Sequence, residues 1–131
     1  MHSSKLFVNY GEAINVSEYY EEYKKNPPRG MNLLRERVAK ELKKYMIHIE
    51  SDEYYEMIDQ IRYIYLPKMI QKMGFIKNKQ PNQFYAQKNI IKNLDEFINM
   101  NPVEAKELNE KTLRYKELLK KLKFRHWVLQ K

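Results

Sequence analysis

The chain has 131 residues, of which 43% are hydrophobic and 32% are charged, so neither a fully disordered polypeptide nor a membrane-embedded bundle is expected. It contains no cysteine, which excludes disulfide frameworks, thiolate metal sites and cysteine nucleophiles. The net charge is +8 and unevenly spread, because residues 1–76 carry 12 basic and 11 acidic side chains whereas residues 77–131 carry 13 and 6. The second part therefore predicts contact with an anionic partner, for which lipid head groups and nucleic acid both qualify.

The first expected element is a short β-strand at the N-terminus. Residues Lys5 to Tyr10 are rich in types that fit a pleated surface, and Gly11 follows them. A strand needs a neighbour to pair its backbone N–H and C=O groups, and no second strand pattern follows in the sequence. We therefore expect an orphan strand that belongs to the sheet of a larger protein. In this chain alone, either the Leu6–Tyr10 strands pair in a homodimer or the N-terminus is disordered.

Helical patterns account for the rest, giving a mainly α fold of about five helices. A short helix is expected after start signals at Asn15 and Ser17, and a loop at residues 26–30 ends it. Amphipathic spacing then predicts a helix over residues 31–49. A cap at Ser51 starts the third helix, which we expect to be kinked at Pro67 and stopped by Gly74.

Two further helices are expected after a polar connector at residues 75–81. The fourth runs from about residue 82 to 99, and the fifth from Pro102 to about Phe124. Asn101 is predicted to cap the fifth helix, with Glu104 completing a capping box. Leu113, with Thr112, is expected on its apolar side.

The fifth helix and its continuation carry the candidate site. Residues 111–131 contain eight basic side chains and one acidic side chain, Glu117. Trp127, the single tryptophan, lies among them as an interfacial anchor would. The residues expected to contact an anionic membrane surface are Arg114, Lys116, Lys120, Lys121, Lys123, Arg125 and Trp127.

No catalytic, cofactor or metal site is predicted. The chain has three glycines and neither a phosphate-binding loop nor a nucleophile elbow. His48 and Glu53 have a spacing that a His–carboxylate pair could use, but a histidine near a helix end is more often structural. His2 and His126 have no partners at metal-ligand spacing.

Several segments between Lys5 and Met73 resemble a known family. The segments at residues 6–20, 26–27, 32–37 and 46–55 are similar to the region that follows the catalytic blocks in bacterial glycerolipid acyltransferases, of the glycerol-3-phosphate and lysophosphatidate type. The resemblance implies a parent enzyme of phospholipid biosynthesis at the cytoplasmic face of the membrane. The family's H-x4-D motif and Glu-Gly block are missing from this chain. No catalytic residue is therefore carried over, and the chain alone is expected to be inert.

The resemblance implies three segments. Residues 1–16 would be a strand stub of the acyltransferase domain, residues 17–76 its helical C-terminal part, and residues 77–131 an added basic helical hairpin. The function expected is that of a non-catalytic C-terminal portion of an acyltransferase, soluble as this fragment, whose partners are the rest of the enzyme chain and an anionic membrane surface.

A second interpretation is a stand-alone basic helical module that binds nucleic acid through its lysines and tyrosines. The tyrosines occur in close pairs, at Tyr19 and Tyr20, at Tyr54 and Tyr55, and at residues 63 and 65. Packing at the edge of the core, with one tyrosine of each pair facing inward, is the favoured explanation. A platform for stacking bases is the alternative.

Overall fold

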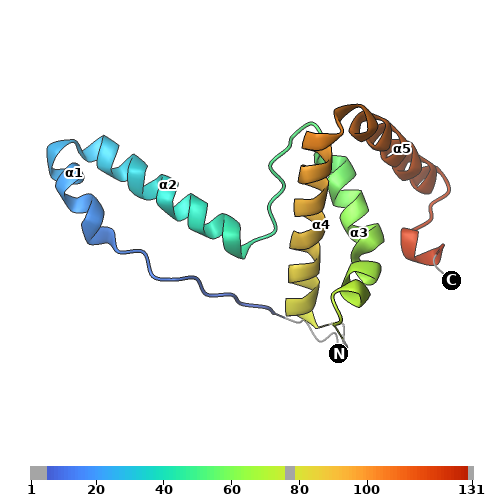
Figure 1. Cartoon of the computed structure of the whole chain (residues 1–131), viewed down its shortest axis with the longest axis horizontal. Helices are drawn as coiled ribbons and strands as arrows, with labels where there is room; N and C mark the ends of the chain where they lie inside the picture. The colour runs from blue at the N-terminus through green and yellow to red at the C-terminus, as the bar shows by residue number, and fades with distance from the viewer. Residues whose placement is uncertain (1–5, 76–78, 130–131) are drawn as a thin grey trace. The chain divides into compact units, whose positions relative to one another are not determined.

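The computed structural model describes residues 6–75 and 79–129, which form two compact units, residues 1–48 and residues 49–131 (Figure 1). Within the described residues all regular elements are helical, namely five α-helices and two 3-10 turns. The predicted mainly α fold of about five helices is confirmed. The division of the chain into three parts of an enzyme stays a prediction.

The predicted strand at the N-terminus is wrong for the residues described. Residues 6–15 form neither helix nor strand, and Lys5 lies outside the described residues. Leu6 and Tyr10 are exposed. An extended segment becomes a strand only when a neighbour accepts and donates its backbone hydrogen bonds, and the described part of the chain offers no such neighbour. The homodimer through this segment stays a prediction.

The first unit is a helical hairpin made of η1 (Val16–Tyr19), α1 (Tyr20–Lys25) and α2 (Pro27–Tyr45). Its start is as predicted, because the Ser17 N–H donates to Oδ1 of Asn15 at 3.2 Å. The predicted loop at residues 26–30 is wrong. Asn26 instead caps α2, accepting from the Arg29 N–H at 3.2 Å, and the two prolines after it occupy a first turn in which no N–H is needed.

Gly30 permits close packing in this hairpin rather than a turn. It is buried within the first turns of α2, where α2 packs against α1. A Cβ atom added to Gly30 would lie 2.6 Å from the Cα atom of Tyr23 on α1. Only a residue without a side chain therefore fits at this contact.

The second unit is built from α3 (Tyr55–Lys72), α4 (Gln80–Met100) and α5 (Pro102–Lys121), followed by η2 (His126–Val128). Helix α3 packs against both α4 and α5, and α4 also packs against α5. Met57, Ile58, Ala86 and Ala105 are fully buried, and the two alanines allow close approach of the helices. Around them lie the other buried apolar side chains, Ile61, Ile70, Ile90, Ile91 and Leu119.

The predicted stop of α3 at Gly74 is confirmed, whereas Ser51 bonds the turn that precedes the helix rather than capping it, since the N-cap residue is Tyr54. Oγ of Ser51 accepts from the Tyr54 N–H at 3.1 Å, just before the helix begins. At the other end, Gly74 has φ +71°, and the Phe75 N–H donates to the Ile70 carbonyl at 3.1 Å. The helix runs through Pro67 without interruption, and the kink there stays a prediction.

The capping box predicted for α5 is not formed. The helix begins at Pro102 as expected, but the Asn101 side chain makes no cap hydrogen bond to it. Nδ2 of Asn101 instead donates to the Phe97 carbonyl at 3.4 Å, at the end of α4. Asn101 therefore serves the end of one helix rather than the start of the next.

Lys123 ends α5 in a conformation that favours glycine. Its φ is +54°, and the Phe124 N–H donates to the Leu119 carbonyl at 3.0 Å, the same pattern that Gly74 gives α3. We expect Lys123→Gly to raise the free energy of unfolding of the second unit by about 0.5–1 kcal/mol in urea denaturation, since glycine adopts this φ without strain. Lys120→Gly, within the helix, is the control and should lower it by about 1 kcal/mol. A less stable Lys123→Gly variant would contradict this assignment.

Candidate functional site

The basic side chains predicted to contact an anionic surface are exposed. Arg114, Lys120 and Lys121 lie on α5, and Lys123 and Arg125 lie in the segment that follows it. In the described part of the chain, none of these five forms an ion pair with a carboxylate. Their charge is therefore available to an outside anion.

Lys116 differs from the other predicted contact residues. Its Nζ forms an ion pair with a carboxylate oxygen of Glu56, in the first turn of α3. Both side chains are about half exposed, so the pair contributes little stability but cancels one positive charge on the surface. Trp127 lies in η2, and its side chain is outside the described ones.

Exposed apolar side chains lie among these cations. Leu118 on α5 and Leu122, the residue that caps the C-terminal end of the helix, are 48% and 60% exposed and lie four residues apart on one face. Phe124 is 48% exposed just beyond the helix end. The surface that we call the basic C-terminal surface, residues 114–125, is thus both cationic and apolar.

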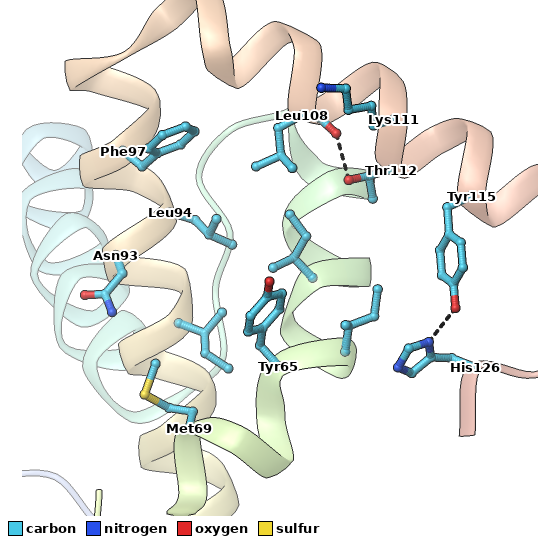
Figure 2. A pocket seen from close by; sticks show the side chains of 13 residues that line it. Tyr65, Met69, Asn93, Leu94, Phe97, Leu108, Lys111, Thr112, Tyr115 and His126 are labelled. Atoms are coloured by element: carbon cyan, nitrogen blue, oxygen red, sulfur yellow. Dashed lines mark hydrogen bonds between the residues drawn. The ribbon is translucent and has the colours of Figure 1, made fainter. Parts of the chain in front are cut away.

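A second feature of the same unit is an apolar pocket of about 650 Å³ between α3, α4 and α5 (Figure 2). Helix α3 contributes Ile61, Ile64, Tyr65 and Met69 to its wall, and α4 contributes Ile90, Asn93, Leu94 and Phe97. The remaining lining residues, on α5 and η2, are Leu108, Lys111, Thr112, Tyr115 and His126. This volume is within the range of small-molecule pockets, roughly 300–1,000 Å³.

Some polar side chains of the pocket are hydrogen-bonded within the protein, and others are exposed to solvent. Thr112 is occupied within its own helix, since its hydroxyl donates to the Leu108 carbonyl at 2.7 Å. The Tyr115 hydroxyl is hydrogen-bonded to Nδ1 of His126 at 2.5 Å, which ties η2 to α5 (Figure 2). Lys111 and Asn93 are exposed at the rim.

The sequence did not predict this pocket. The helical stripes correctly placed Ile64, Leu94 and Phe97 toward neighbouring helices, yet these side chains remain only half-buried because the helices do not fill the space between them. On α5, Leu113 and Thr112 were both expected on the apolar side, and Thr112 is buried as expected whereas Leu113 is exposed. Hydrophobic periodicity predicts which side of a helix faces its neighbours, but not how closely those neighbouring helices pack against it.

The tyrosine pairs follow the favoured explanation in two cases of three. Tyr19 and Tyr54 are half-buried while their neighbours Tyr20 and Tyr55 are exposed, as core-edge packing predicts. Residues 63 and 65 are both exposed, so the expectation that one tyrosine of this pair faces inward is not met. Among the described residues, no titratable cluster that could hold a metal ion is found.

In comparisons with known proteins, no family model, curated protein or solved structure matches the chain. Within residues 6–75 and 79–129, none of the helices has both the length and the apolar character needed to cross a membrane.

Proposed function

We propose that the chain is a non-catalytic helical module whose basic C-terminal surface binds an anionic membrane. The observation that carries this proposal is the mixture of side chains on residues 114–125. Five basic groups that have no carboxylate partner among the described residues lie beside exposed Leu118, Leu122 and Phe124. Such a segment binds lipid in two ways at once, because cations attract anionic head groups and apolar side chains enter the interface.

Nucleic acid is the alternative partner for the same charges. Phosphate groups would attract the lysines equally well, and binding would weaken steeply with salt. The exposed leucines favour the membrane, however, because aliphatic side chains gain free energy on leaving water for an acyl layer, whereas a phosphate backbone offers them little apolar surface.

The parent enzyme is a separate part of the proposal. Resemblance within residues 5–73 supports a C-terminal portion of a glycerolipid acyltransferase, and a membrane-binding tail would suit an enzyme with lipid substrates. The strand predicted at the N-terminus does not support this parentage, because residues 6–10 form no strand. The proposal of a membrane-binding surface does not depend on this parentage.

The test is binding of the chain to vesicles of phosphatidylserine and phosphatidylcholine at low salt, measured by co-sedimentation. Replacing Lys120 and Lys121 together by glutamine is expected to weaken binding about 30-fold, since each lysine near an anionic surface contributes about 1 kcal/mol. Lys40→Gln with Lys92→Gln removes the same charge from α2 and α4 and should change binding less than about threefold.

Two results would overturn the proposal. One is equal weakening by the two double variants, which would mean that only net charge matters. The other is preference for duplex or single-stranded DNA over the vesicles at the same salt concentration, which would establish nucleic acid as the partner.

A further inference from the structure

The wall of the pocket in the second unit has the chemistry of a site for a hydrocarbon chain. Aliphatic side chains from α3 and α4 dominate it, including Ile61, Ile64 and Leu94, and Phe97 adds an aromatic face (Figure 2). The Thr112 hydroxyl is directed to the Leu108 carbonyl and so presents no free donor to the interior. Thr112 is a buried polar side chain of the wall, and an apolar ligand would leave its hydroxyl paired.

The rim supplies one full positive charge. Lys111 lines the pocket, and its Nζ forms an ion pair with Oε2 of Glu107, one turn earlier on α5, at 3.3 Å. Both of these side chains are largely exposed, so the pair is weak and Lys111 can exchange it for another anion. No carboxylate lines the pocket itself.

We infer that this pocket binds a single-chain amphiphile with an anionic head group, its hydrocarbon chain against α3 and α4 and its head group at Lys111. The volume of about 650 Å³ suits a small-molecule ligand. The charge at the rim selects the sign of the head group. The Tyr115–His126 hydrogen bond holds η2 as part of the wall.

The inference is independent of membrane binding by the basic C-terminal surface. The pocket lies between three helices, and none of the five unpaired cations of that surface lines it. Lys120→Gln with Lys121→Gln should therefore leave amphiphile binding within about twofold of the unchanged chain, so the two proposals can fail separately.

The first experiment is isothermal titration calorimetry of the full chain with decanoate and dodecanoate, each below its critical micelle concentration, in the absence of vesicles. Saturable binding with one ligand per chain is expected. Affinity should rise about 15-fold between the two, because each added methylene that enters the pocket gains about fourfold. Dodecanol, which has no charge, should bind about fivefold more weakly than dodecanoate at low salt.

Two variants locate the ligand. Ile64→Trp should fill the pocket and abolish binding of dodecanoate, while Tyr85→Trp, at an exposed position of α4 outside the pocket, should not change it. Lys111→Met should weaken dodecanoate about fivefold and leave dodecanol unchanged, whereas Lys106→Met, on the same helix but outside the pocket, should affect neither. Circular dichroism confirms that each variant keeps its helices.

Three results would overturn the inference. Failure of both carboxylates to bind would exclude the amphiphile. Equal weakening by Ile64→Trp and Tyr85→Trp would place it elsewhere. A dimer of the unchanged chain that Ile64→Trp dissociates, with no amphiphile bound, would show that a second copy covers the pocket.

Discussion

Replacing Gly30 by alanine is expected to unfold the α1–α2 hairpin of the first unit while the second unit keeps its structure. The added methyl group would lie 2.6 Å from Cα and 2.7 Å from N of Tyr23, and backbone atoms cannot move aside as a flexible side chain can. Overpacking of this kind costs about 1–3 kcal/mol. The hairpin has little stability to lose, since Gly30 and Glu41 are its only buried residues among those described.

Whether Gly30→Ala lowers or raises the stability of the hairpin distinguishes overpacking from helix propensity. Alanine is favoured over glycine by about 1 kcal/mol within a helix, so helix propensity alone predicts a more stable α2. Hydrogen–deuterium exchange of the full chain separates the two outcomes, because faster exchange in residues 20–45 reports loss of the hairpin. Lys40→Ala, on the exposed side of α2, should leave exchange unchanged. Slower exchange in Gly30→Ala would mean that the close contact with Tyr23 does not form.

Local chemistry made several helix ends predictable. Asn15 and Gly74 act on backbone groups within four residues of themselves, so the sequence around each contains all that determines its role. Asn101 shows the limit of that reasoning, because it stands between two helices and its side chain can serve either. It binds the Phe97 carbonyl, and nothing in the sequence alone ranks that choice above the cap.

Features that depend on distant neighbours were not predictable. Residues 6–10 have the composition of a strand, but a strand also requires a partner. The segment Asn26-Pro27-Pro28-Arg29-Gly30 suits both a turn and a helix start, and the contact of Gly30 with Tyr23 is part of the helical solution. A glycine required for close packing has the same sequence signature as a glycine required for a turn.

The basic C-terminal surface could be predicted from the sequence in large part, whereas the pocket could not. Exposed lysines could be predicted from the charge pattern, since charged side chains rarely lie buried. The pairing of Lys116 with Glu56 could not, because 60 residues separate them. The pocket requires knowing where three helices fail to meet, and Leu94 or Phe97 would show the same periodicity in a closed core.

Truncation of Ile58 to alanine is expected to destabilise the second unit by about 2–5 kcal/mol, the range for large-to-small changes in a well-packed core. Ile58 is fully buried on α3, so the cavity left behind has no access to water and the surrounding helices cannot close it completely. A domain of this size has a stability of roughly 4–12 kcal/mol, so the loss should be a large part of the total. Urea denaturation, followed by the helical signal, measures it.

Ile64→Ala is the matched control, because it removes the same atoms from the same helix at a position that lines the pocket. Ile64 is only half-buried and already faces open space, so its truncation enlarges an existing hollow and forfeits fewer contacts. We expect its cost to be less than half that of Ile58→Ala. Equal losses would indicate that Ile64 is as tightly packed in solution as Ile58. Helices α3, α4 and α5 would then close on one another, leaving no room for a ligand between them.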